Sequence, residues 1–332
     1  MTSKRMLVIL PTWVGDCVMA TPVLRALRSA FPDAHILAGV GGGIDTLLAG
    51  SEWCNAVLRV RFKGTLGPFT DASLLRACRA DTIVLLPNSF RTALGVRFAG
   101  ATRRIGYARD GRGILLTHTI APPTEKPFSA VDYYAQLVEK AFNITVSDRR
   151  VELIVTADET RKALSLLAGV SGAPLVLNPG ANNPLKRWSA ENFAKVARIS
   201  MKQGQSVVVT GGPKERELVD AVVKLAPGAI NLIERGVDLG GLKGVLARAA
   251  CLLTNDTGPR HIAAALSTPV VTLFGPTDHR WTTLVHVQER LLLAEPFLTH
   301  DTFADQHPNA CLMERIAVKD AVEAIRSIAR TS

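Results

Sequence analysis

Short runs of apolar residues alternate along the chain with longer stretches whose apolar positions repeat at a helical spacing. Met6–Leu10 predicts a buried strand, and Cys17–Phe31 predicts an amphipathic helix. His35–Val40 predicts a second strand, which runs into a cluster of glycines. Thr82–Leu86 predicts another strand, and Val131–Phe142 predicts another helix. This alternation of strands and helices indicates a parallel, doubly wound sheet.

The same alternation begins again in the second half of the chain, after a junction that we place within residues 156–173. We therefore expect an α/β protein with two doubly wound domains, residues 1–160 and 161–332, and a final helix over 318–330 that returns toward the first domain. In open α/β sheets, ligands bind at the carboxyl ends of the strands, so we expect the functional residues there. The predicted strands of the second half are Leu175–Leu177, Ser206–Thr210, Cys251–Thr254 and Val270–Phe274, and the predicted helices are Ala190–Gln203, Glu215–Leu225, Leu239–Ala249, Pro259–Leu266 and Val318–Arg330.

The composition indicates a two-domain globular protein and argues against a membrane or secreted one. The chain has 332 residues, and its 47% apolar content is enough for two buried cores. It contains no apolar run long enough for a transmembrane helix, and the apolar stretch near its start is too short for a signal peptide, so we expect it in the cytosol. Five scattered cysteines without a C-x-x-C pair argue against a zinc site or a disulfide framework.

A formal net charge of +10 indicates an anionic partner, which can be nucleic acid, a phosphate-rich substrate or an anionic membrane surface. Aromatic residues make up only 5% of the chain and do not interleave with basic ones, which disfavours nucleic acid.

The stretch Thr254–His261 (TNDTGPRH) follows a buried predicted strand and begins a helix. The unpaired N–H groups and partial positive charge of a helix N-terminus suit a diphosphate. Thr257 adds a hydroxyl group, and Gly258 lets a phosphate approach the backbone. His261 lies one turn into the same helix.

Two further loops at the same edge favour a ligand site over the alternative, in which Asp256 or Thr257 only caps the helix. Gly275–Asp278 follows the next predicted strand. Asn178–Trp188 follows the first strand of the second half and carries Lys186, which is well placed to neutralise phosphate charge. A solvated surface lysine is the alternative.

Two acidic residues also follow predicted strands. Glu215, in the turn Gly211–Glu215, either accepts hydrogen bonds from a ribose diol or complements a helix dipole, and the sequence alone favours the second. Asp16, in Pro11–Asp16, is either an N-cap or a carboxylate available as a general base. Neither this turn nor Gly39–Gly43 contains G-x-G-x-x-G, so a dinucleotide fingerprint is absent.

Basic residues cluster in the first half of the chain. Arg59, Arg61 and Lys63 would share one face of an extended segment, which favours phosphate or carboxylate recognition over a merely soluble surface. Further arginines of this half are Arg91, Arg103, Arg104, Arg109 and Arg112. No metal site is predicted, because the spacing of the one group of potential metal ligands fits no known type of metal site. That group is His300, Asp301, Asp305, His307 and Cys311.

Together these stretches resemble glycosyltransferase family 9, the ADP-heptose:lipopolysaccharide heptosyltransferases, over residues 6 to about 325. The most specific motif is Asn255–Asp278. His307–Ile316 and the sequence Trp-Val-Gly-Asp at residues 13–16 are similar to the second type of heptosyltransferase. The other motifs that carry the resemblance are Pro11–Thr21, Asn178–Trp188 and Thr210–Glu217.

The resemblance implies a GT-B fold, in which two Rossmann-like domains face a central cleft. The N-terminal domain would bind the acceptor and the C-terminal domain the nucleotide sugar. Asp16 would be the general base, Lys186 would bind the diphosphate and Glu215 the ribose. The phosphate- and sugar-binding loop would comprise Asp256, Thr257, Gly258 and His261, and the acceptor would contact Arg59, Arg61 and Lys63. The family inverts the anomeric carbon and needs no metal or other cofactor for the chemistry.

The expected reaction is the transfer of heptose from ADP-L-glycero-D-manno-heptose to the inner core of lipopolysaccharide. The acceptor would be an anionic, lipid-linked oligosaccharide, and a monomeric enzyme would meet it at the inner face of the cytoplasmic membrane. The alternatives are a transferase of the same fold that uses another nucleotide sugar, a sugar-nucleotide epimerase, and a non-catalytic anion-binding protein. Two departures from the family leave the acceptor open: Ala294–Gln306 lacks the usual paired cysteines, and Pro259-Arg260 replaces an apolar pair.

Overall fold

The computed structural model describes residues 5–62, 67–124, 129–294 and 311–329, and they form two compact units. The first unit runs to Ile154 and also includes Arg280–Val285, and the second comprises Val155–His279 and the chain from His286 onward. The boundary therefore lies between residues 154 and 155, whereas the sequence analysis placed it between 160 and 161. Arg280–Val285, which we had assigned to the second domain, packs with the first unit, where the carbonyl of Trp281 accepts a hydrogen bond from the Ala130 amide (2.8 Å).

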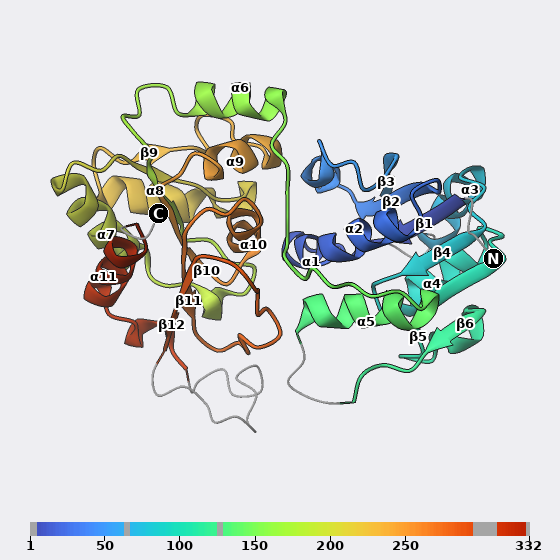
Figure 1. Ribbon diagram of the computed structural model, residues 1–332. Coiled ribbons are helices and arrows are strands. Elements are labelled where there is room, and N and C mark those ends of the chain that lie inside the picture. Colours follow the sequence, from blue (N-terminus) through green and yellow to red (C-terminus); the bar gives the residue numbers. More distant parts are fainter. Residues whose placement is uncertain (1–4, 63–66, 125–128, 295–310, 330–332) are drawn as a thin grey trace. The chain divides into compact units, whose positions relative to one another are not determined.

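The first unit is a parallel sheet with helices against it (Figure 1). Its strand order is β3-β2-β1-β4-β5-β6, so the chain reverses its direction of winding beside β1. The strands are β1 (Arg5–Ile9), β2 (His35–Gly41), β3 (Ala56–Val60), β4 (Thr82–Leu85), β5 (Arg103–Tyr107) and β6 (His118–Ile120). The helices are α1 (Val14–Met19), α2 (Thr21–Ala30), α3 (Gly67–Ala77), α4 (Phe90–Arg97) and α5 (Ala130–Phe142), with short 3-10 helices η1 (Asp45–Leu48) and η2 (Arg112–Leu115).

The predicted helix Cys17–Phe31 is in fact two helices that meet at Ala20. Pro22 lies at the first turn of α2 and lacks the N–H that a continuous helix would need. The hydroxyl of Thr21 donates instead to the carbonyl of Val18 (2.8 Å), within the last turn of α1. The turn that carries Asp16 is therefore a short separate helix.

The second unit has the same architecture, with strand order β12-β11-β10-β7-β8-β9 (Figure 1). All of its strand pairs are parallel, as in the first unit. The strands are β7 (Leu175–Asn178), β8 (Val207–Val209), β9 (Ile230–Asn231), β10 (Cys251–Asn255), β11 (Val270–Phe274) and β12 (Glu289–Leu293). The helices are α6 (Ala157–Leu166), α7 (Ala190–Lys202), α8 (Arg216–Leu225), α9 (Leu239–Leu246), α10 (Gly258–Ala265) and α11 (Val318–Ala329), with 3-10 helices η3 (Pro184–Lys186), η4 (Pro213–Glu215) and η6 (Met313–Arg315).

Helix α11 belongs to the second unit, within the predicted range 161–332, and its expected return toward the first domain stays a prediction. It packs against α7 and against β10, β11 and β12. Its buried residues Ala321 and Ile325 join the core that contains Trp188, whose indole N–H donates to the Ile316 carbonyl just before the helix (3.1 Å). The apolar face of α11 is thus covered by elements of its own unit.

Within the described residues, no helix has both the length and the apolar character needed to cross a membrane.

Candidate active site

The loops that follow β7 and β10 are tied together at the carboxyl edge of the second sheet. The two strands are neighbours, with Asn178 opposite Thr254. The side-chain amide of Asn178 donates to the hydroxyls of Thr254 (3.0 Å) and Thr257 (3.1 Å). The side-chain amide of Asn255 donates to the carbonyls of Pro179 (2.8 Å) and Gly180. These bonds hold the start of α10 beside the loop that leads to Lys186.

Lys186 forms an ion pair with Asp256 across these two loops. The distance from its Nζ to Oδ2 of Asp256 is 3.1 Å, and the other carboxylate oxygen lies 3.2 Å from the guanidinium of Arg260. The side chain of Lys186 is 25% exposed, whereas those of Asp256 and Arg260 are 8% and 1% exposed. Lys186 is therefore the cation of this group that solvent, or an anionic ligand, can reach.

Asp256 remains ionised although it is buried. Burial by itself raises the pKa of a carboxyl, but the charges of Lys186 and Arg260 outweigh it here and lower the pKa of Asp256 below its usual value. An ionised, buried carboxylate needs cations beside it, because an unpaired charge in this position is costly. The charge state of Asp256 thus depends on the two cations that flank it.

Helix α10 begins directly after this ion pair, at Gly258. Its N-cap residue is Thr257, but the Thr257 side chain makes no capping hydrogen bond and instead contacts Asn178 and Thr254. The simple capping function that we considered for Thr257 is therefore not what its side chain does. An uncapped helix N-terminus beside a lysine is suited to bind an anion.

His261 is buried in the first turns of α10 and is uncharged. Burial, reinforced by the positive charge of Arg260, lowers the pKa of His261 to about 3. Among the described residues, its Nδ1 is buried without a hydrogen-bond partner. A neutral imidazole here can accept or donate one hydrogen bond without adding charge to the site.

The low pKa of His261 predicts an acid-dependent loss of stability. An unfolded chain binds a proton at this residue below about pH 6.5, and the folded chain does not until about pH 3. The free energy of unfolding should therefore fall as the pH drops through this window, by about 2 kcal/mol from this residue at pH 5. We expect urea unfolding at pH 7.5 and pH 5 to show a larger loss for the natural protein than for His261→Gln. Equal losses in the two proteins would mean that His261 titrates normally.

Glu215 has a local structural contact in addition to its predicted function. Its carboxylate accepts a hydrogen bond from the Gly212 amide (2.7 Å). The same carboxylate packs directly against Gly180, where a Cβ atom would collide with it. Gly180 belongs to the loop that leads to Lys186, so Glu215 lies against this loop. The Asn255 side chain also binds the loop, through the Gly180 carbonyl. The ribose contact expected of Glu215 remains a prediction.

Asp16 lies at the corresponding edge of the first sheet, in the first turn of α1. The N-cap of this helix is Trp13, so the alternative that Asp16 is the N-cap is wrong. The side chain of Asp16 is half-buried, and its Oδ1 accepts a hydrogen bond from the hydroxyl of Tyr134 on α5 (3.2 Å). Burial and the neighbouring Asp16 charge raise the pKa of Tyr134 well above its usual value, so the phenol stays a donor. Sequence reasoning missed Tyr134.

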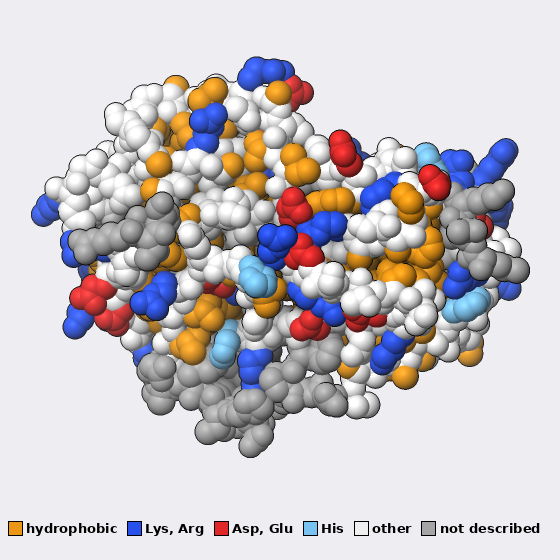
Figure 2. Space-filling model, in the orientation of Figure 1, with side chains coloured by type: hydrophobic (Ala, Val, Ile, Leu, Met, Phe, Trp, Pro, Cys, Tyr) orange, Lys and Arg blue, Asp and Glu red, His pale blue; other side chains and the backbone are white. Residues whose placement is uncertain are grey.

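Arg59 and Arg61 lie at and just after the end of β3, the edge strand that pairs with β2. Arg59 is exposed and pairs with Asp45 (2.6 Å), and this arginine lowers the pKa of Asp45. The backbone amide of Arg61 donates to the carboxylate of Asp71, which fixes the turn after the strand. Lys63 lies outside the described residues, as do His300, Asp301, Asp305 and His307. Figure 2 shows basic side chains spread over the visible face with acidic ones among them, so the basic residues do not form a single patch there.

Comparison with known proteins decides the family. The model of glycosyltransferase family 9 (heptosyltransferase) matches residues 72–312. The chain belongs to glycosyltransferase family 9. Lipopolysaccharide heptosyltransferase 2 of Escherichia coli is 30% identical over 298 residues, which cover 84% of this chain and 84% of that protein.

Solved structures agree with this family and with the fold. The structure of E. coli ADP-heptose lipopolysaccharide heptosyltransferase II matches with a TM-score of 0.84 and 25% identity, covering 98% of this chain and 99% of that one. A family 9 glycosyltransferase from Veillonella parvula matches with a TM-score of 0.87 and 21% identity over 100% of this chain and 99% of that one. The two doubly wound, Rossmann-like units are thus those of a GT-B glycosyltransferase, as the resemblance implied.

As a family 9 member the chain is a glycosyltransferase, and its candidate residues fall into two groups. Lys186, Asp256, Thr257, Gly258 and His261 come together at one edge of the second sheet. Asp16 follows β1 and Arg59 and Arg61 lie on and after β3, at the carboxyl edge of the first sheet, with β2 between these two strands. Among the described residues, no group of three potential metal ligands occurs.

Proposed function

We propose that this glycosyltransferase moves heptose from ADP-L-glycero-D-manno-heptose to the inner core of lipopolysaccharide. The observation that carries the proposal is the match over most of both chains to proteins named lipopolysaccharide heptosyltransferase 2, from E. coli at 30% identity and, as lipooligosaccharide heptosyltransferase 2, from Haemophilus influenzae at 28%. The acceptor would be an anionic, lipid-linked oligosaccharide. A monomeric enzyme in the cytoplasm, in peripheral contact with the inner membrane surface, would meet this acceptor, and the net charge of +10 favours that contact.

The proposed donor site is the edge of the second sheet at Lys186 and α10. Lys186 would bind the diphosphate, and the N–H groups at Gly258 would add hydrogen bonds at the helix N-terminus. Glu215 would accept hydrogen bonds from the ribose, and Asp256 and His261 would contact the sugar. These groups supply positive charge and donors where the leaving diphosphate gains negative charge, so the proposed chemistry uses no metal or other cofactor.

The proposed reaction is a single displacement with inversion. The acceptor hydroxyl attacks the anomeric carbon, and Asp16 takes the hydroxyl proton as general base. The bond from the anomeric carbon to the diphosphate oxygen breaks on the opposite side, and ADP leaves with the bonding electrons. The hydrogen bond from the Tyr134 hydroxyl to Oδ1 orients the carboxylate of Asp16.

A turnover assay tests the proposed function. The purified protein should release ADP from ADP-heptose only when a heptose-deficient core lipid is present, and the mass of the lipid should increase by one heptose. ADP-glucose and UDP-N-acetylglucosamine, tested in parallel, should not replace the donor. Transfer from one of these sugars instead would identify a transferase with another donor, and conversion of a nucleotide sugar without acceptor would identify an epimerase.

Binding of the acceptor lipid should depend on Arg59 and Arg61 at the end of β3. Arg59→Glu combined with Arg61→Glu should raise the KM for the acceptor lipid by about tenfold or more and make it less dependent on salt, because attraction to acceptor phosphates is screened by ions. The dissociation constant of ADP should stay within about twofold. The control is Arg161→Glu with Arg248→Glu, two exposed arginines of the second unit that give the same change in net charge. An equal rise in KM in both variants would mean that only the overall charge matters.

A further inference from the structure

Arg260 is a buried arginine that two carboxylates hold at once. Its Nε and one terminal nitrogen bind the two oxygens of Glu289 at 2.6 and 3.0 Å, and its other terminal nitrogen lies 3.2 Å from Asp256. The guanidinium also stacks over the ring of Phe274, 5.0 Å from the ring centroid. Although burial opposes the charged form, the two carboxylates raise the pKa of Arg260 above its usual value. The guanidinium is therefore a fixed, permanent charge.

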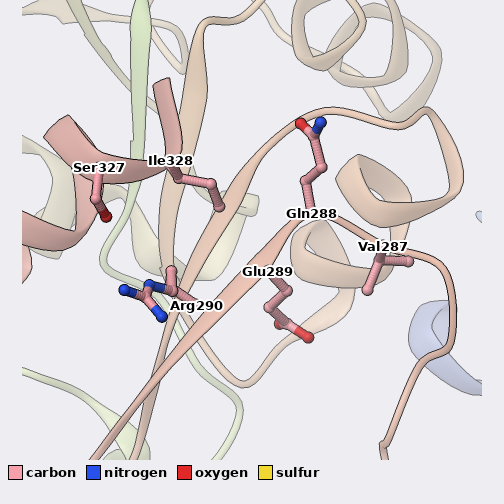
Figure 3. A pocket seen from close by; sticks show the side chains of 6 residues that line it. All are labelled: Val287, Gln288, Glu289, Arg290, Ser327 and Ile328. Carbon is pink, nitrogen blue, oxygen red and sulfur yellow. The ribbon is translucent and has the colours of Figure 1, made fainter. Parts of the chain in front are cut away.

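Glu289 orients the guanidinium of Arg260. It is the first residue of β12, and its side chain and that of Arg290 leave the strand on opposite sides (Figure 3). The hydroxyl of Thr272 on β11 donates to the same carboxylate. The side chain of Glu289 is 8% exposed, and it binds Arg260 through both carboxylate oxygens. It thus fixes the guanidinium in the plane that reaches Asp256.

The four side chains form a neutral group of two cations and two anions, and only one member of the group is accessible. Glu289 neutralises Arg260, and Asp256 is shared between Arg260 and Lys186. A diphosphate that draws Lys186 toward itself removes one of the two cations that keep Asp256 ionised. Arg260 cannot move in the same way, because Glu289 holds it. The charge that remains beside Asp256 is then that of Arg260.

We infer that Arg260 is a positioning residue that keeps Asp256 charged and in place while Lys186 moves from Asp256 to the diphosphate of the donor. This inference rests on the proposed function in that it takes Lys186 as the diphosphate ligand. With Arg260 present, the release of Lys186 leaves a buried carboxylate that is still paired. Without Arg260, diphosphate binding would leave Asp256 buried and unpaired, and the ligand would bind more weakly.

A three-part series of variants tests this inference with ADP as the probe and titration calorimetry as the readout. Arg260→Met with Glu289→Gln removes the buried pair together and keeps an acceptor for Thr272, because removing one partner alone would strand a buried charge. We expect this double variant to bind ADP about tenfold more weakly. Asp256→Asn alone, and Asp256→Asn added to the double variant, complete the cycle.

The decisive comparison is how much removal of the Arg260–Glu289 pair weakens ADP binding when residue 256 is Asp and when it is Asn. When residue 256 is Asn, no charge needs a partner, so we expect removal of the pair to change ADP affinity by less than about twofold. An equal tenfold loss in both backgrounds would overturn the inference and leave Arg260 with a purely structural function. An unchanged affinity in the double variant would overturn it as well. If the double variant fails to fold, Arg260→Lys takes its place. Its single ammonium group can pair with Glu289 but not with Asp256 at the same time, so we expect weaker ADP binding with Asp256 and unchanged ADP binding in the Asp256→Asn background, and equal losses in both backgrounds would overturn the inference.

This experiment can fail separately from the proposed function. The cycle measures only nucleotide binding, whereas the proposed function requires transfer from ADP-heptose. A cycle that behaves as expected in an enzyme that transfers another sugar would support the inference and reject the heptose donor. If the enzyme transfers heptose but removal of the Arg260–Glu289 pair has the same effect with Asp256 and with Asp256→Asn, the proposed function is supported and the inference is rejected.

Discussion

Replacing Asp16 with asparagine is expected to lower kcat by at least about 10², the lower end of what a positioned general base contributes. An acceptor hydroxyl is a weak nucleophile at neutral pH, and an amide cannot take its proton. Asparagine has the shape of aspartate and keeps an oxygen for the hydroxyl of Tyr134, so the local structure should persist. Steady-state kinetics with saturating donor and acceptor give kcat, and calorimetry should show an ADP dissociation constant within a few-fold of the natural value.

Stability measurements separate this base function from a structural one. Asp16 lies in the first turn of α1, where loss of its charge removes a favourable interaction with the helix dipole worth about 0.3–1 kcal/mol. Asp33→Asn, an exposed change in the same unit, is the matched control and should alter neither kcat nor the melting temperature appreciably. A lowered melting temperature with near-normal kcat in Asp16→Asn would show that the carboxylate acts only in folding.

The strands that the sequence predicted correctly are those buried on both faces. These strands consist almost entirely of buried residues, and such strands read as continuous apolar runs. They are β1, β2, β4, β7, β8, β10 and β11. β3, β5, β6, β9 and β12 were missed. Each has polar or exposed positions, such as Arg103 and Arg104 at the start of β5 and the exposed residues of β12 at the sheet edge. A run interrupted in this way cannot be told from a loop by periodicity alone.

The clustering of Lys186, Asp256 and His261 could be predicted because the segments that carry them follow buried strands, and neighbouring parallel strands end at one edge of the sheet. The partners of these residues could not be predicted in the same way. Tyr134 meets Asp16 across 118 positions of sequence, and Arg260 meets Glu289 across 29. Such pairings depend on the packing of α5 and on the register of β12, and neither can be predicted from a short stretch of sequence. Arg260 stood out only as a departure from the family, with no sign of its partner.

Helix α11 shows what a helical spacing of apolar residues predicts and what it does not. Its helical spacing of apolar residues was correctly recognised, and the observed helix begins at the predicted Val318. Periodicity states that one face is buried, however, and not which core buries it. The hydrogen bond between Trp188 and the Ile316 carbonyl, and the packing on α7, place the helix with the second unit.

Replacing Lys186 with alanine is expected to raise the dissociation constant of ADP by about 10- to 100-fold, because hydrogen bonds to charged groups contribute about 1.5–3 kcal/mol each. Lys186 is the accessible cation of its group, and in the structure it already meets one anion, Asp256, at 3.1 Å. A diphosphate carries more charge than a carboxylate and would compete for the same ammonium group. The effect should weaken as salt is added, since the site is partly open to solvent.

The loss of Lys186 should affect binding far more than folding, because Asp256 keeps its ion pair with Arg260. Lys195→Ala, an exposed lysine on α7 in the same unit, is the matched control and should leave the ADP affinity unchanged. Calorimetric titrations of both variants, together with their melting temperatures, make the comparison. An ADP affinity in Lys186→Ala equal to that of the control would exclude Lys186 as the diphosphate ligand. Lys186→Arg should recover only part of the affinity, because the guanidinium keeps the charge but is planar and larger than the ammonium group, so it cannot take the same position.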